Sequence, residues 1–172
     1  AGESDLCAAI AEHSARFYNH MVDSVREISV TSGASEALWC MAFAFIEPGD
    51  EVILFEPFFD TYVPNITMAG GVPVPITLRA PDFRPDPDDL RRAFSPKTKL
   101  ILVNTPHNPT GTVLNNTELQ LIADLCQAHD VLAVTDEVYE HIVFSGAAHK
   151  RLAQFPGMAE RTLTISSGGK TF

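Results

Sequence analysis

Short apolar runs rich in Val, Ile and Leu alternate along this chain with segments of helical periodicity. The runs predict strands at residues 27–30, 51–55, 72–78, 100–104, 131–135 and 162–165. Continuous apolar strands are typical of parallel sheets that helices cover on both faces. The alternation therefore predicts a three-layer α/β/α fold with a mostly parallel sheet, formed as one domain by residues 1–172.

The segments between these runs carry the signals of helices. Apolar spacing predicts helices at residues 6–21, 37–46, 60–69, 87–94 and 115–129. Asp5 is the expected N-cap of the first helix. Pro73 and Pro75 place the strand at 72–78 on an edge of the sheet, because proline has no N–H to donate to a neighbouring strand.

Charge and composition exclude several classes of function. The net charge of −10 argues against a nucleic-acid partner, because phosphate backbones select for Lys and Arg. No apolar run approaches the roughly 20 residues of a membrane helix, and we expect no membrane association. The three cysteines have no CxxC spacing, which predicts reduced thiols in a cytoplasmic protein. Glu137 and His141 are four apart, but no third ligand is near in sequence, so we expect no metal site.

Polar turns follow four of the predicted strands. They lie at residues 33–36, 104–111, 136–139 and 166–170. In open parallel sheets, ligands bind outside the carboxyl ends of the strands. Because each of these turns leaves a carboxyl end, we expect all of them to meet at one edge of the sheet.

Lys170 ends the last of these turns and has two interpretations. Most lysines are exposed and solvated, and a loop lysine is the ordinary case. The alternative is a lysine that forms a Schiff base, since an amine on a flexible stem can act as a nucleophile in a partly buried site. Gly168 and Gly169 would let a flat ring approach the backbone, and the two preceding serines would hold an anion.

Other side chains of the turns suit a protonated heterocycle. Asp136 ends an apolar run, where a carboxylate is costly unless it is paired, and a protonated ring nitrogen would pair with it. Tyr139 is three residues on and would reach a neighbouring ring atom if this turn is helical. Asn108 offers an amide to a ring oxygen. Phe59 either stacks on the ring or packs in the core.

Residues 31–35 precede a predicted helix and also have two interpretations. Free backbone N–H groups and the helix dipole would hold a phosphate there. The alternative is a simple N-capping turn, since Ser is a common N-cap. Ser167 would add a hydroxyl to the same anion. A lysine for an aldehyde, an acid for a ring nitrogen and a nest for a phosphate together describe the binding of pyridoxal phosphate.

With these residues in place, the chain resembles the large domain of fold-type I aminotransferases of class I/II over essentially its whole length. The Glu-Pro-Phe-Phe-Asp segment is most similar to the branch that holds kynurenine/glutamine and methionine aminotransferases. The segments that carry the resemblance are 30–38 (VTSGASEAL), 56–62 (EPFFDTY), 104–111 (NTPHNPTG), 135–139 (TDEVY) and 166–172 (SSGGKTF).

The resemblance implies a role for each matching residue. Lys170 would be joined to the cofactor and would move the substrate's Cα proton, and Asp136 would pair with the ring nitrogen. Tyr139 and Asn108 would contact the phenolic oxygen of the ring, and Phe59 would stack on the ring. The phosphate would be bound by the backbone amides of Ala34 and Ser35 and by the hydroxyl of Ser167.

The resemblance also implies amino-acid and 2-oxo-acid substrates and a homodimer of a full-length parent. Such enzymes are about twice as long as this chain or longer. We therefore expect residues 1–172 to be part of the large domain, without an N-terminal segment and a C-terminal small domain. Two alternatives stay open: a carbon–sulfur β-lyase on the same scaffold, and a non-catalytic cofactor-binding remnant or partner subunit.

Overall fold

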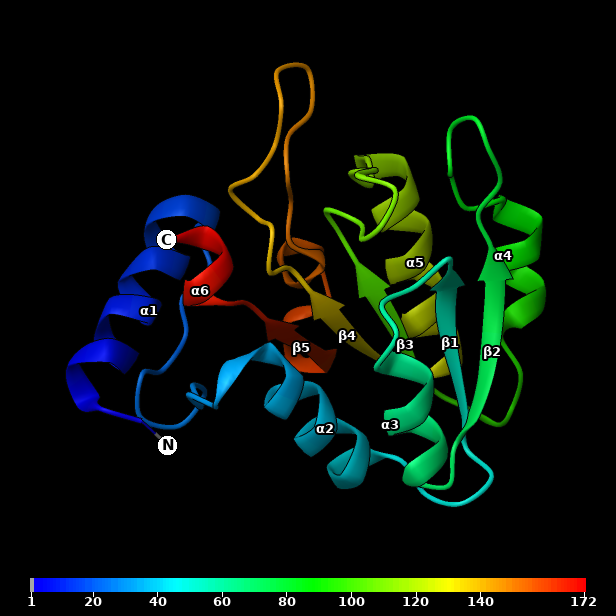
Figure 1. Ribbon diagram of the computed structural model, residues 1–172, viewed down its shortest axis with the longest axis horizontal. Helices are drawn as coiled ribbons and strands as arrows, with labels where there is room; N and C mark the ends of the chain where they lie inside the picture. The colour runs from blue at the N-terminus through cyan, green and yellow to red at the C-terminus, as the bar shows by residue number, and fades with distance from the viewer. Residues whose placement is uncertain (1) are drawn as a thin grey trace.

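A single parallel sheet of five strands forms the centre of the computed structural model, which describes residues 2–172 (Figure 1). The order across the sheet is β2-β1-β3-β4-β5, and every neighbouring pair is parallel. These strands are β1 (Glu51–Glu56), β2 (Val72–Thr77), β3 (Thr98–Asn104), β4 (Leu132–Asp136) and β5 (Thr162–Ile165). The expected parallel α/β architecture is confirmed, and proline-containing β2 lies at an edge.

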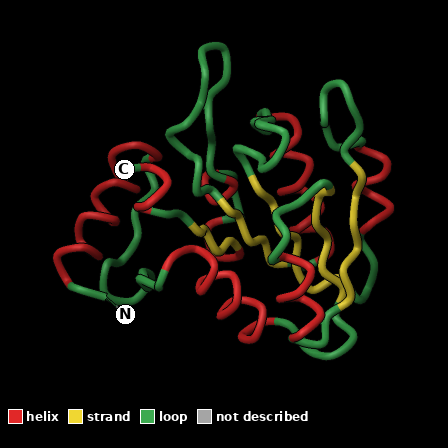
Figure 2. Tube along the Cα trace, in the orientation of Figure 1, coloured by secondary structure: helices red, strands yellow, loops and turns green. Residues whose placement is uncertain are grey.

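Helices cover both faces of the sheet and one of its edges, which Figure 2 shows in red against the yellow strands. The helices are α1 (Ser4–Tyr18), α2 (Gly33–Phe45), α3 (Tyr62–Met68), α4 (Pro87–Ala93), α5 (Asn116–His129) and α6 (Gly168–Thr171), with 3₁₀ turns η1 (Leu152–Gln154) and η2 (Ala159–Arg161). α2 and α3 pack on one face, and α4 and α5 on the other. α1 lies beyond β5, at the edge opposite β2 (Figure 1).

The alternation of side chains along each strand divides the core into two layers. Ile53, Ile101 and Ala133 belong to the layer that packs against α4 and α5. Their sequence neighbours Leu54 and Leu102 belong to the layer that packs against α2 and α3. This period of two also decides to which face a polar residue at the end of a strand points.

Local capping explains where several helices begin. Asp86 accepts hydrogen bonds from the amides of Asp88 and Asp89 and caps α4. Asn115 and Glu118 form a reciprocal capping box at the start of α5. The expectation for α1 was wrong, because its N-cap is Glu3 rather than Asp5.

The predicted strand at 27–30 is absent from the described structure. The Glu27 amide donates to the carbonyl oxygen of Asp23, so this segment starts in a turn rather than in a ladder. α2 also begins earlier than expected, at Gly33 instead of Ala37. The turn at 33–36 is therefore the first turn of α2 and does not follow a strand.

Candidate active site

The ends of β3 and β4 bring two polar side chains onto the face that α2 and α3 cover. Asn104 and Asp136 are register partners, and each continues the set of alternate strand residues that packs against these helices. Asn104 Nδ2 donates to the main-chain oxygen of Asp136 at 2.9 Å, and the Thr105 amide donates to the same oxygen at 3.2 Å. These bonds fix the chain at the point where β4 ends.

The Asp136 carboxyl group is buried, with 4% of the residue exposed. Its Oδ2 accepts the hydroxyl of Tyr62 at 2.6 Å, and its Oδ1 accepts the Val138 amide at 3.3 Å. Burial raises the pKa of Asp136 above its ordinary value, and these two hydrogen bonds oppose the rise only in part. The long bond at Oδ1 leaves this oxygen with capacity for a second, stronger donor.

Tyr62 is a site residue that the sequence did not reveal. It is the first residue of α3, 2% exposed, and burial followed by the charge of Asp136 raises the pKa of its phenol. The Phe59 ring meets the Tyr62 ring edge-on, with ring centres 5.8 Å apart. Phe59 is half-buried and packs against the core layer under α2 and α3. A stacking role for Phe59 stays a prediction.

The turn after β3 is held by its own hydrogen bonds. Asn104 Oδ1 accepts the Asn108 amide at 2.7 Å, and the Gly111 amide donates to the His107 carbonyl at 2.8 Å. His107 is buried, which lowers the pKa of its imidazole, and it also bonds the carbonyl of Pro57 in the turn after β1. The turns that carry Asn108 and Phe59 are therefore joined through His107.

The first turn of α2 presents backbone amides, and its binding of an anion stays a prediction. Gly33 has φ +77°, a conformation that favours glycine, and its amide bonds the Thr31 carbonyl. The Glu36 carboxylate accepts the Ser32 amide, so Ala34 and Ser35 carry the next amides of the helix N-terminus. Such amides point toward an anion, and the helix dipole favours one.

α2 contacts β5, which brings its first turn toward the segment that follows β5 (Figure 1). Ser167 lies there, directly before α6, and is half-buried. No hydrogen bond among residues 2–172 joins Ser167 to the first turn of α2, so their shared binding of one anion stays a prediction.

Lys170 and Tyr139 are brought together from the turns after β5 and β4. The Lys170 ammonium nitrogen lies 5.7 Å from the centre of the Tyr139 ring. A main-chain bond of 2.8 Å from the Glu137 amide to the Ile165 carbonyl joins the two turns at their bases. The Lys170 side chain is exposed, and Tyr139 is half-buried. The turns after β3, β4 and β5 thus meet at one edge, as predicted, whereas the fourth predicted turn, at 33–36, belongs to α2 and follows no strand.

Behind this edge is a buried charge network that the sequence did not reveal. Among residues 2–172, the side chains whose ligand atoms lie within 4.8 Å of one another and could hold a metal are His13, Glu140 and His141 in one group and Glu137, Glu140 and His149 in another. The Arg151 guanidinium forms ion pairs with both glutamates. This one cation offsets only one of the two carboxylate charges, and we describe the arrangement by its observed contacts, as an ion-pair network.

None of the helices in residues 2–172 has the length and apolar content needed to cross a membrane. No disulfide joins Cys7, Cys40 or Cys126 within residues 2–172.

Comparison with known proteins gives a consistent result. The family model described as aminotransferase class I and II matches residues 1–172. Human kynurenine–oxoglutarate transaminase 3 is 48% identical over 99% of this chain and 40% of its own length. A probable N-succinyldiaminopimelate aminotransferase of Mycobacterium tuberculosis is 47% identical over 99% of this chain and 44% of its own length. The chain therefore spans less than half the length of the curated relatives it matches.

Solved structures agree with the fold. The N-succinyldiaminopimelate aminotransferase from M. tuberculosis has a TM-score of 0.97 at 47% identity, covering 99% of this chain and 45% of that one. YbdL from Escherichia coli, described with a methionine aminotransferase function, has a TM-score of 0.96 at 38% identity and the same coverage.

Proposed function

We propose that this chain, which belongs to the class I and II aminotransferase family, is the cofactor-binding part of a pyridoxal-phosphate enzyme. The reaction is the transfer of an amino group from an amino acid to a 2-oxo acid. In this proposal residues 1–172 correspond to part of the large domain of that enzyme.

One observation carries the proposal. The buried carboxylate of Asp136 follows β4 at the carboxyl edge of the parallel sheet, and from the neighbouring turn the Lys170 amine lies 5.7 Å from the Tyr139 ring centre. Asp136 Oδ1 has capacity for a strong donor, which a protonated ring nitrogen would supply. The first turn of α2 suits a phosphate, and Lys170 suits an aldehyde. The residues present therefore fit pyridoxal phosphate.

When bound, pyridoxal phosphate supplies an aldehyde and an electron-withdrawing ring. Asp136 would hold the proton on the ring nitrogen, because a buried carboxylate is stabilised by a cationic partner. Tyr62 would keep the Asp136 carboxylate ionised and oriented through its 2.6 Å bond. Lys170 would bind the aldehyde and then carry the substrate's Cα proton as a general base and acid.

The remaining residues would orient the ring and its phosphate. Asn108 and Tyr139 would donate to the phenolic oxygen, and Phe59 would cover one ring face. Ala34 and Ser35 would bind the phosphate through their amides. Ser167 would bind the same phosphate through its hydroxyl.

The substrates are proposed at the level of class, as an amino acid and a 2-oxo acid. The relatives are named as transaminases for kynurenine with oxoglutarate and for N-succinyldiaminopimelate, and these names supply the first substrates to test. Because the relatives carry aminotransferase names, the carbon–sulfur lyase alternative is not favoured. A homodimer and a cytoplasmic location complete the proposal, and the location is supported by three cysteines that form no disulfide in the described residues.

The first experiment tests the cofactor and its attachment point. Purified protein is incubated with pyridoxal phosphate, reduced with borohydride and mapped by mass spectrometry. We expect the label at Lys170, its loss in Lys170→Arg and its persistence in the matched control Lys150→Arg, an exposed loop lysine. A label that survives in Lys170→Arg at the same yield would contradict the assignment.

The second experiment tests the reaction. The labelled peptide shows binding only, so formation of 2-oxo acid from kynurenine, N-succinyldiaminopimelate, methionine and other amino acids is measured with 2-oxoglutarate as acceptor. Labelling at Lys170 without product in a protein of the relatives' full length would support the non-catalytic alternative.

A further inference from the structure

Two adjacent carboxylates at the end of β4 point to opposite faces. Asp136 faces α2 and α3, while Glu137 is fully buried on the other side, where it meets Arg151 and His149. Arg151 Nε lies 3.1 Å and His149 Nε2 lies 3.0 Å from the same Glu137 oxygen. A buried carboxylate needs such partners, because taking its charge out of water is costly.

Glu140 is the second carboxylate of this network and lies directly after Tyr139. It accepts Arg151 Nη2 at 2.8 Å and the hydroxyl of Ser166 at 2.5 Å. Burial alone would raise the pKa of Glu140, but hydrogen bonds from Ser166 and Tyr18 and the charge of Arg151 outweigh it and lower that pKa. Glu140 is therefore an ionised acceptor when it binds Ser166.

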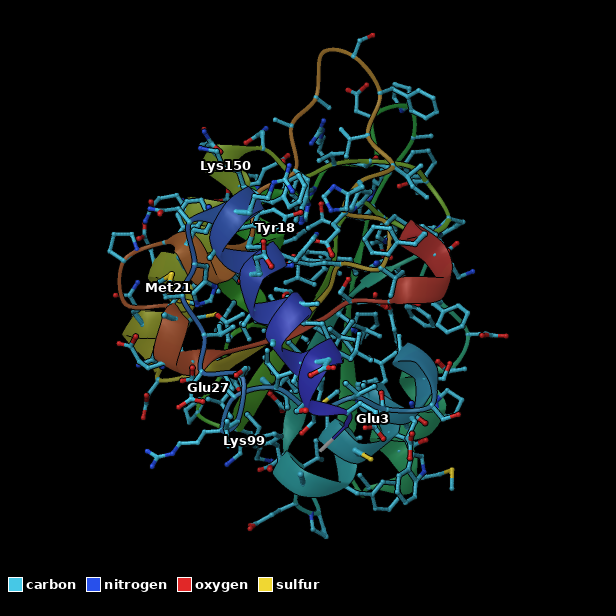
Figure 3. The ribbon with its side chains drawn as sticks, turned by 90° about the vertical axis from the view of Figure 1, so that its left-hand side faces the viewer. Glu3, Tyr18, Met21, Glu27, Lys99 and Lys150 are labelled. Carbon is cyan, nitrogen blue, oxygen red and sulfur yellow. The ribbon has the colours of Figure 1, made fainter. Side chains whose placement is uncertain are left out.

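Arg151 is anchored on α1, the helix that covers the β5 edge. Its Nη1 donates to Ser14 Oγ at 3.1 Å, and its guanidinium lies 3.9 Å from the centre of the Tyr18 ring. Figure 3, which faces α1, labels Tyr18 on the last turns of this helix. Gln154 adds a bond of 2.6 Å to the Tyr18 carbonyl and accepts the Arg151 amide at 3.0 Å. Ser14 and Tyr18 thus hold the Arg151 guanidinium, and Gln154 holds the Arg151 main chain.

We propose that Glu140, held by Arg151, and Ser166 act together as a clamp that positions Lys170 relative to Asp136 and Tyr139. The inference rests on the proposed function and adds positioning residues to it. Ser166 is four residues before Lys170, and Glu140 is next to Tyr139, so one hydrogen bond joins both functional turns.

The clamp joins the two turns beyond the last main-chain hydrogen bond of the sheet between them. The bond from the Glu137 amide to the Ile165 carbonyl is the last main-chain tie between the two turns in the described part of the chain. Beyond Ile165 the backbone leaves the ladder, and the Ser166 hydroxyl makes the next tie. A planar guanidinium reaches two carboxylates at once, which a lysine ammonium at the same position does not do with equal geometry.

A first test follows the order of the lysine turn without cofactor. The Phe172 amide donates to the Gly168 carbonyl at 2.9 Å and reports whether α6 is formed. Hydrogen exchange of this amide is measured by NMR in wild type, Ser166→Ala, Ser166→Thr and the control Ser145→Ala, an exposed loop serine.

We expect about tenfold faster exchange in Ser166→Ala, the fold-change that corresponds to losing one hydrogen bond to a charged group. Ser166→Thr, which keeps the hydroxyl, and Ser145→Ala should exchange like wild type. Unchanged exchange in Ser166→Ala, or equal acceleration in Ser166→Thr and Ser166→Ala, would overturn the clamp.

A second test asks whether the clamp positions the amine. The equilibrium constant for attachment of pyridoxal phosphate is measured by titration before reduction in the same variants, with borohydride used only to locate the attachment, and we expect the constant to fall about tenfold only in Ser166→Ala. A merely stabilising role would lower the unfolding midpoint and leave attachment unchanged, which would also overturn the proposal. Failure of wild type to attach at Lys170 would instead refute the proposed function, while the exchange result still decides the clamp.

A third test links Arg151 to the same hydrogen bond. Arg151→Lys keeps the positive charge but loses the planar guanidinium that pairs with two carboxylates. It should therefore speed hydrogen exchange of the Phe172 amide in the wild-type background and cause little further acceleration in the Ser166→Ala background. Arg161→Lys is the matched control, since Arg161 pairs with Asp130 at the surface. If the effects of Arg151→Lys and Ser166→Ala on hydrogen exchange were additive, Arg151 would not act through Glu140. That result would overturn the proposed role of Arg151 in the clamp.

Discussion

Replacement of Tyr62 by phenylalanine tests how the protein keeps a buried carboxylate ready for a cation. Tyr62→Phe removes one oxygen and preserves the ring that packs in the core layer under α2 and α3. The lost oxygen is the donor that lies 2.6 Å from Asp136 Oδ2. Because Asp136 is 4% exposed, water does not replace this donor without rearrangement.

The cost depends on the ionisation state of Asp136. A hydrogen bond to a charged group contributes about 1.5–3 kcal/mol, and one between neutral groups about 1 kcal/mol. Tyr62→Phe should therefore lower the free energy of unfolding by about 1 kcal/mol when Asp136 is protonated. The loss should rise to roughly 2–3 kcal/mol when Asp136 is ionised.

The pH dependence has a definite sign. The pKa of Asp136 is raised by burial in the folded protein, so the folded state binds this proton more tightly than the unfolded state. Stability from this group is greatest below the ordinary aspartate pKa and decreases as pH rises toward the raised folded pKa. Loss of the Tyr62 hydroxyl raises the folded pKa further, so the difference between variant and wild type grows with pH in this window.

Urea unfolding between about pH 4 and pH 8 measures this difference directly. The same substitution in an Asp136→Asn background is the control, since the asparagine does not titrate. There the cost of Tyr62→Phe should be independent of pH. A cost that is equally flat in both backgrounds would refute the argument that Tyr62 stabilises the ionised carboxylate.

Other substitutions separate chemistry, anion binding and packing. Asp136→Asn should lower kcat more than it weakens cofactor binding, because the amide does not hold the ring proton; an effect on KM alone, in steady-state kinetics, would contradict this role. Gly33→Ala should cost about 1 kcal/mol in urea unfolding and weaken pyridoxal phosphate binding by titration, because φ is +77°. Gly71→Ala should cost about 1–3 kcal/mol in thermal unfolding and leave that binding unchanged, since its Cβ would lie 2.7 Å from Ile46 Cγ2 and 3.0 Å from Ile66 Cγ2. Equal binding losses in the two glycine variants would contradict a specific anion site at α2.

The parts of the fold that follow from local pattern could be predicted from the sequence. β5 begins and ends where its apolar run does, and β2 lies at the edge that its prolines require. The approach of Lys170 to Tyr139 also followed, because it needs only parallel strands and their shared carboxyl edge.

The contacts that support these residues could not be predicted in the same way. Tyr62 reaches Asp136 across 74 positions of sequence, and Arg151 reaches Ser14 across 137. Neither pair has a periodic or spacing signal, since each depends on how a helix is placed against the sheet. The predicted strand at 27–30 failed for a related reason: an apolar alternation specifies a strand only where a neighbouring strand offers hydrogen bonds, and Glu27 instead bonds Asp23.

The pleat of β4 explains how one short segment can serve both chemistry and support. Because successive side chains alternate, Asp136 and Glu137 cannot share a face, although they are adjacent in sequence. Asp136 is buried beside a neutral phenol, whereas Glu137 is buried beside a fixed guanidinium, although its Oε1 accepts no hydrogen bond from the described residues. A carboxylate that is already paired with a cation gains little stabilisation from a second cation. Of these two residues, Asp136 is therefore the one that we expect to bind a protonated ring. Glu137 instead pairs with Arg151 and His149 on the far side of the same segment.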